Sequence, residues 1–144
     1  MQKMRFTIEI SASKEKVWEV LWSDKTFRDW ASIIDESSYM VGEMKEGNEV
    51  QFISSVSGYG VTSLVEKLKL YELVVLRQIV DTKEHGTGER KKEWADGTES
   101  YHLTGNDTIT TLTTELDVPK EQIETFQVRL PKALQRIKEL TESM

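Results

Sequence analysis

The sequence predicts an α+β fold, with one antiparallel sheet and a long C-terminal helix. Three observations lead to this prediction: an alternating apolar strand near the N-terminus, a series of strand patterns separated by turns, and a helical apolar stripe at the end. The 144 residues have the size of one ordinary domain, and no linker divides them. We therefore expect a single domain over residues 1–144.

The chain opens with the pattern of one strand followed by two short helices. Apolar side chains at positions 4, 6, 8 and 10 alternate with polar ones, which is typical of a strand with one buried face. Ser13 has the position of an N-cap before the apolar stripe of a first helix. Ser23 or Asp24 begins a second helix, which carries Trp30 on its apolar side.

Six further strands are predicted between Tyr39 and Val118. A three-residue hairpin loop at 58–60 sets Phe52 opposite Glu66, and a two-residue loop before the next strand sets Glu66 opposite Arg77. Leu64 and Leu68 mark the face of Glu66 as the buried one, because two lysines lie on the other face.

The last hairpin and the segment before it complete the predicted sheet. A two-residue turn at Asn106 sets Tyr101 opposite Leu112, so that apolar groups meet apolar groups. Residues 82–97 are polar, with Trp94 as their only large apolar group, and we expect them to form an extended hairpin or flap.

A helix from about Lys120 to Ser143 closes the chain. Its apolar stripe includes Phe126 and Leu130. Pro131 lies inside the helix, where its ring and its missing donor predict a bend near residues 127–131.

Three passages of this sequence carry a resemblance to a known superfamily. They are ISASKEKVWEVL at 10–21 followed by Trp30, EWADG at 93–97 followed by Tyr101, and KALQRIKEL at 132–140. With the element order, they resemble the START-like superfamily of polyketide-cyclase, Bet v allergen and lipid-transfer relatives. Within it the chain most resembles the branch named after the C-terminal domain of Aha-type activators of heat-shock-protein ATPase.

The resemblance covers essentially the whole chain and implies a helix-grip fold. In that fold a curved seven-stranded sheet wraps around the C-terminal helix and leaves an internal cavity. The matching motifs are packing and capping features, so they indicate the fold and do not choose among ligand binding, catalysis and co-chaperone activity.

Ten residues are the candidates for contact with a ligand in that cavity. Large amphipathic rings are common pocket walls, although each one could instead be plain core. The candidates are Trp30, Tyr39, Phe52, Glu66, Arg77, Trp94, Tyr101, Leu112, Phe126 and Leu130.

Glu66 and Arg77 form the most specific of these predicted pairs. If both point inward they should pair, because an unpaired buried charge costs several kcal/mol. Arg77 could then orient a ligand carboxylate or enolate. The alternatives are a structural cross-strand ion pair, or an outward-facing pair if the two faces are reversed.

Composition excludes several classes of function. The net charge of −6 disfavours nucleic acid, and the absence of cysteine removes thiolate metal sites. His85 and His102 lack partners at ligand spacing, and no phosphate loop, nucleophile elbow or dinucleotide fingerprint occurs. We therefore expect no metal, no cofactor and no nucleic-acid partner.

No stretch approaches the ~20 apolar residues of a membrane span, so we expect a cytoplasmic protein. We also expect it to be monomeric or weakly dimeric.

The leading hypothesis is the binding of a small apolar or amphipathic ligand, lipid-like or polyketide-like. A second hypothesis is an enzyme of the cyclase, dehydratase or lyase kind, with Arg77 or Tyr101 stabilising an oxyanion and Glu66 transferring protons. A third is a stress-related, co-chaperone-like interaction domain.

Overall fold

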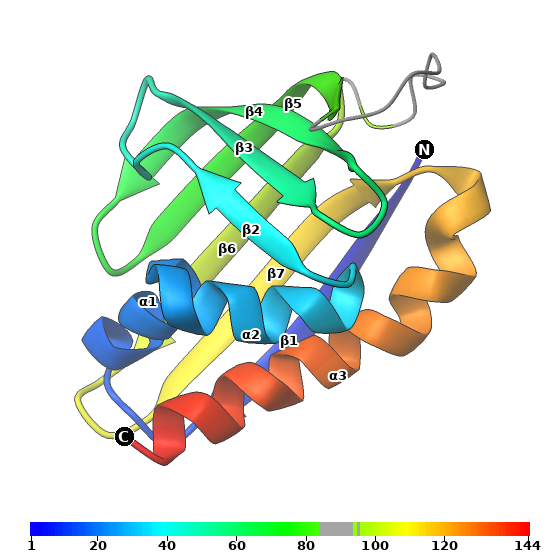
Figure 1. Cartoon of the computed structure of the whole chain (residues 1–144). Helices are drawn as coiled ribbons and strands as arrows, with labels where there is room; N and C mark the ends of the chain where they lie inside the picture. The colour runs from blue at the N-terminus through cyan, green and yellow to red at the C-terminus, as the bar shows by residue number, and fades with distance from the viewer. Residues whose placement is uncertain (84–93, 95) are drawn as a thin grey trace.

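The computed structural model describes residues 1–83, 94 and 96–144, and its elements follow the predicted order (Figure 1). The strands and helices are β1 (Gln2–Ile10), α1 (Lys14–Trp22), α2 (Asp24–Ile34), β2 (Ser38–Val41), β3 (Glu49–Ser54), β4 (Tyr59–Lys69), β5 (Leu73–Lys83), β6 (Thr98–Gly105), β7 (Thr110–Val118), the 3₁₀ turn η1 (Lys120–Gln122) and α3 (Ile123–Glu142).

The described strands form one curved antiparallel sheet in the order β1-β7-β6-β5-β4-β3-β2. Figure 1 shows α2 and α3 running together across one face of this sheet. The predicted α+β helix-grip architecture is therefore confirmed. None of the helices in the described part of the chain has the length and apolar character that crossing a bilayer requires.

The opening elements form for the reasons that the sequence suggested. In β1, Met4 and Ile10 are buried while Arg5 between them is exposed. The hydroxyl of Ser13 accepts a hydrogen bond from the Lys16 N–H at 3.3 Å, which caps the first turn of α1. Ser23 occupies the N-cap position of α2 without a side-chain hydrogen bond.

The closing helix is bent, as Pro131 predicted. Figure 1 shows the first turns of α3 running down from the end of β7 before the helix changes direction and lies across the sheet. Pro131 is exposed within α3, and a proline ring inside a helix conflicts with the turn that precedes it, which accounts for the bend.

The interior is packed solidly at one end of the sheet. Leu103 and Leu112 face each other across β6 and β7, and both are essentially inaccessible to solvent. Leu21 of α1 and Ile137 of α3 are fully buried in the same core. The hollow part of the interior lies toward the opposite end, where β7 leads into α3.

Three predicted strand registers are wrong, although the strand neighbours are right. Phe52 pairs with Val61 and not with Glu66, because the chain turns through residues 55–58 and β4 already begins at Tyr59. Leu68 pairs with Val74 across a longer turn, in which Tyr71 takes a positive φ of 65°.

The last hairpin is displaced by two residues from the prediction. Tyr101 pairs with Thr114, and Leu103 pairs with Leu112. The loop is longer than two residues because the Asn106 carboxamide accepts hydrogen bonds from the N–H groups of Thr108 and Ile109. Since the shift is even, the predicted faces of both strands are kept.

The predicted faces of β4 are reversed in its first half. Ser63 and Val65 are buried, whereas Leu64 is half-buried on the other side. A β-bulge at Glu66 inserts one extra residue, so that Val65 pairs with Leu76 and Lys67 with Val75. The predicted flap at 82–97 lies mostly outside the described residues.

Candidate functional site

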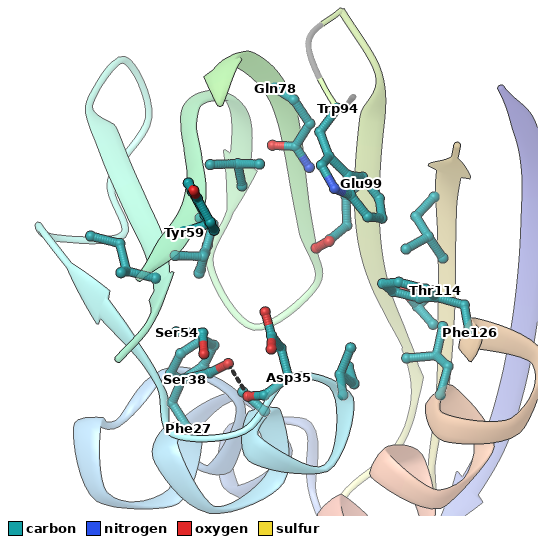
Figure 2. A pocket seen from close by; sticks show the side chains of 18 of the residues that line it. Phe27, Asp35, Ser38, Ser54, Tyr59, Gln78, Trp94, Glu99, Thr114 and Phe126 are labelled. Atoms are coloured by element: carbon teal, nitrogen blue, oxygen red, sulfur yellow. Dashed lines mark hydrogen bonds between the residues drawn. The ribbon is translucent and has the colours of Figure 1, made fainter. Parts of the chain in front are cut away.

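A cavity of about 160 Å³ lies between the sheet and the two longer helices. Its walls come from β2 to β7, from α2 and the turn after it, from Trp94 before β6, and from the start of α3 (Figure 2). The lining residues are Phe27, Ala31, Ile34, Asp35, Ser38, Phe52, Ile53, Ser54, Tyr59, Gly60, Val61, Gln78, Trp94, Glu99, Tyr101, Thr114, Leu116, Phe126 and Leu130. An apolar cavity of about 150 Å³ is large enough to hold a benzene ring.

Aromatic rings form two opposite parts of the wall. Trp94 and Phe126 contact each other with their ring centres 5.3 Å apart, which ties the segment before β6 to α3. Phe27 of α2 and Phe52 of β3 are 5.7 Å apart on the other side. These rings offer a ligand both apolar area and π faces.

The main polar feature of the cavity is a carboxyl and phenol pair on β6. Glu99 and Tyr101 are two residues apart in the strand, so their side chains share the inner face, and the Tyr101 hydroxyl donates to Glu99 Oε2 at 3.0 Å. Burial raises the pKa of Glu99, and the hydrogen bond from Tyr101 acts in the opposite direction. Burial and the neighbouring Glu99 charge raise the pKa of Tyr101 well above its ordinary value.

A buried amide lies beside this pair. Gln78 of β5 accepts a hydrogen bond from the Ser63 hydroxyl of β4 through its Oε1 atom. The backbone of Gln78 also bonds to the segment before β6, because its N–H donates to Gly97 O at 2.8 Å and its carbonyl accepts from Asp96 N–H at 2.8 Å. These bonds hold the polar end of the cavity in place.

A second polar group comes from the turn between α2 and β2. Asp35 in this turn and Ser38 at the start of β2 line the cavity, and the Ser38 hydroxyl donates to the Asp35 carbonyl. The Ser54 hydroxyl of β3 donates to Glu36 O at 2.6 Å, so the turn is fastened to the sheet. In Figure 2 the Asp35 carboxyl points into the cavity from the side opposite Glu99.

The structure brings five of the ten predicted residues together around this cavity. They are Phe52, Trp94, Tyr101, Phe126 and Leu130. Trp94 is positioned by a hydrogen bond from its backbone N–H to Asp81 Oδ1 at 3.1 Å.

Three other predicted residues lie behind or beside the lining. Trp30 is buried between α1 and α2, where its indole N–H lies 3.2 Å from Val20 O, and its ring contacts Phe27 and Tyr101. Leu112 belongs to the solid core. Tyr39 lies on β2 with the Arg28 guanidinium 5.2 Å from its ring centre.

Glu66 and Arg77 form a pair, but on the outer face of the sheet. Arg77 Nε donates to Glu66 Oε2 at 3.2 Å, and a second bond joins Nη2 to Oε1. Their side chains are 36% and 54% exposed, so the pair is a solvent-facing bridge, which was one of the alternatives open from the sequence. Neither Glu66 nor Arg77 therefore lies in the cavity, where the catalytic hypothesis required them.

Glu99 and Gln78 are cavity residues that sequence reasoning missed. Alternation from Tyr101 would have placed Glu99 on the inner face, so that signal was present. Gln78 shares a face with the buried Val74 and Leu76, but the prediction put the opposite face of β5 inside.

The described side chains offer no evident metal centre. Among the residues that the structure describes, no group of three or more histidine, aspartate or glutamate side chains is placed to hold an ion. His102 is exposed, and His85 lies outside the described residues. The arrangement is suited to enclosing a ring-sized molecule and to contacting its polar group.

Comparisons with known proteins bear on the fold. No protein-family model and no curated protein matches the sequence. Among solved structures, the Aha1 dimer from Colwellia psychrerythraea is 18% identical, with 99% of this chain and 97% of that chain covered and a TM-score of 0.74. Protein MLL2253 from Mesorhizobium loti is 12% identical, with coverage of 99% and 98% and a TM-score of 0.77.

A third structural neighbour is a longer protein. DynU16, a protein of the dynemicin biosynthetic locus, is 15% identical with a TM-score of 0.71 over 99% of this chain. This chain spans about half the length of DynU16, since 48% of that protein is covered. At these identities the likeness shows the fold alone, and it confirms the fold that the resemblance in the sequence implied.

Proposed function

We propose that this protein binds a small apolar or amphipathic molecule in the cavity between its sheet and its helices. The observation that carries the proposal is the cavity itself, a ring-sized hollow with aromatic walls and a polar group at each of two sides. Concave, mostly apolar sites with a few convergent polar groups are the usual form of small-molecule sites.

The energetics favour an amphipathic ligand over a purely apolar one. A ring-sized group buries about 150 Å², which at about 25 cal/mol per Å² is worth about 4 kcal/mol. That energy corresponds to a dissociation constant near 1 mM, before any cost of ordering the ligand. Tighter binding therefore needs polar contacts, which Glu99, Gln78 and Ser38 are positioned to supply.

The structural neighbours are in keeping with a small-molecule role. DynU16 belongs to a biosynthetic locus, and its fold is shared by this chain. The Colwellia psychrerythraea protein is a dimer. For this chain we propose a monomer or a weak dimer. Sedimentation over a range of protein concentrations would measure its oligomeric state.

Filling the cavity is the sharpest test of the binding function. Ala31 is buried on α2 and lines the cavity, so Ala31→Leu should occupy part of the hollow and exclude a ligand without weakening the fold. Phe126→Ala should weaken binding by removing a wall. Val128→Ala on the exposed side of the same helix is the matched control.

Native mass spectrometry of the purified protein is the measurement. We expect the unmodified chain and Val128→Ala to carry a bound small molecule, and Ala31→Leu to have lost it. An equal load in all three proteins would place the ligand outside the cavity, and unchanged thermal stability across a panel of ring-sized amphiphiles would argue against the function itself.

A further inference from the structure

Two carboxylic acids are among the described residues that line the cavity. Glu99 enters from β6 and Asp35 from the turn after α2, and Figure 2 shows both carboxyls directed into the same space. Among lining residues whose side chains the structure describes, none is lysine, arginine or histidine. An ionised Glu99 would repel a ligand whose negatively charged group approached the β6 side of the cavity.

Glu99 is the better placed of the two acids to contact a buried ligand. Its neighbours across the ladder are Leu76 and Leu116, both buried, and Tyr101 donates to one of its two carboxylate oxygens. An ionised carboxyl in such apolar surroundings is costly unless an opposite charge approaches it. The raised pKa of Glu99, caused chiefly by burial, agrees with that cost.

Aromatic rings surround the space in front of this carboxyl. Trp94 and Phe126 lie on one side in Figure 2, and Tyr59 and Phe27 lie on others. A cation that leaves water is attracted to ring faces, and the attraction is strongest where the site is desolvated. Rings and a carboxylate together form the usual chemistry for holding an ammonium group.

We propose that the ligand of this cavity is a cationic amphiphile, an amine or quaternary ammonium compound whose apolar part has about the size of one ring. Its ammonium group pairs with Glu99, and its apolar part lies between Trp94, Phe126 and Phe52. This assignment rests on the proposed binding function and gives it a ligand class.

Binding of such a cation is coupled to the protonation of Glu99. The ammonium group stabilises the ionised carboxylate, so the protein releases a proton when the ligand binds at a pH near the Glu99 pKa. Among the residues that the structure describes, the other titratable groups lining this space are Asp35 from the α2–β2 turn, Tyr59 from β4 and Tyr101 from β6. Affinity for the amine should therefore rise with pH until Glu99 is fully ionised.

Three probes of nearly equal shape separate charge from size. They are 2-phenylethylamine, 2-phenylethanol and 3-phenylpropanoate, whose affinities can be measured by isothermal titration calorimetry at pH 7. We expect the amine to bind at least tenfold more tightly than the alcohol, and the propanoate at least tenfold more weakly than the alcohol.

Matched variants then assign the preference to a residue. Glu99→Gln keeps a group that can accept from Tyr101 and should remove the amine's advantage over the alcohol. Glu124→Gln removes the same charge from an exposed position on α3 and should leave the preference intact. The comparison of the three probes on the unmodified protein requires no variant, and it tests the charge preference if Glu99→Gln fails to fold.

The outcomes distinguish this inference from the function on which it rests. Equal binding of amine and alcohol, or tightest binding of the propanoate, would overturn the cationic class while leaving the cavity as a binding site. A preference for the amine that survives in Glu99→Gln would overturn the role of Glu99. Failure of all three probes, together with equal ligand loads in the cavity-filling test, would overturn the binding function itself.

Discussion

Glu99 combines a charged group with a largely apolar environment, and this combination affects the stability of the empty protein. Its carboxyl faces the cavity beside buried leucines, with the Tyr101 hydroxyl at 3.0 Å. Burial raises the Glu99 pKa in the folded state above the ordinary value of 4.5, and the Tyr101 hydrogen bond offsets the shift only in part. The native state therefore holds the Glu99 proton more tightly than the unfolded chain does.

This proton linkage predicts the pH dependence of a Glu99→Gln variant. Below pH 4.5 the Glu99 carboxyl lowers the free energy of unfolding least, compared with a side chain that is always neutral. As the pH rises from 4.5 through the folded-state pKa, the cost of the ionised carboxyl lowers the stability of the wild-type protein progressively. We expect Glu99→Gln to raise the melting temperature relative to wild type more at pH 8 than at pH 4, as measured by calorimetry. Glu124→Gln, as a control, should lack this dependence, and an effect of Glu99→Gln that is the same at both pH values would contradict the linkage.

At the scale of single elements, β4 shows what the sequence could not reveal. Odd-numbered residues face inward before the extra residue at Glu66, and even-numbered residues face inward after it. Val65 and Leu68 therefore both reach the core. A prediction that assumes strict alternation must place one of these two residues on the wrong face. Because the prediction placed Leu64 and Leu68 on one buried face, it also placed Glu66 and Arg77 inside. The same assumption placed Gln78 on the outer face of β5, so Gln78 was not predicted as a cavity residue.

The hairpin loops were the other source of error in the predicted site. Element type and order were predictable because β1, α3 and the last two strands have clear periodicity, and the even slip at β6 and β7 left Tyr101 facing inward. Loop length was not predictable, because side-chain hydrogen bonds such as those of Asn106 add residues to a turn. Four of the six described aromatic residues that line the cavity were therefore predicted, whereas Phe27, Tyr59 and most of the polar groups were not.

Gly60 is the position where the pairing of β3 with β4 depends on a missing side chain. A Cβ atom there would lie 2.0 Å from Phe52 O and 2.7 Å from the Ile53 Cα, which are backbone atoms that cannot move aside. Gly60→Ala should force the two strands apart, with a loss of at least about 2 kcal/mol in the free energy of unfolding. Denaturant titration would measure this loss.

Gly47→Ala provides the comparison for that variant. Gly47 has a positive φ of 89° but open space around it, so alanine there should cost only the conformational penalty of about 1 kcal/mol. A Gly60→Ala variant no less stable than Gly47→Ala would show that the strands can separate at little cost.

For the molecule as a whole, the pair of helices α2 and α3 closes the open side of the sheet. Arg136 donates to both oxygens of Asp29 at 2.7 and 2.9 Å, and Arg129 donates to the Ile34 carbonyl at the end of α2 at 2.9 Å. The hydrogen bond with Arg136 and its charge hold the Asp29 pKa below its usual value of 3.8 against the opposing effect of burial.

The lowered Asp29 pKa gives the helix pair a predictable acid sensitivity. The stabilisation is present above pH 3.8, the unfolded-state value, and is lost as the pH falls through the folded-state pKa. Asp29→Asn should therefore lower the melting temperature slightly at pH 7 and have less effect at pH 2.5. The same variant in high salt should show a smaller loss at pH 7, because this is a surface pair, and a loss unaffected by pH would contradict the assignment.

The pairing of the first strand with the last has a consequence during protein synthesis. Ile10 pairs with Thr110 and Gln2 with Val118, so β1 is made early but finds its ladder partner at least one hundred positions later. Contacts so distant along the chain form slowly and require nearly all of the polypeptide to be available. A ribosome-bound chain that has not reached residue 110 therefore exposes the unpaired edge of β1 and its apolar side chains, in a state that is prone to association with other chains.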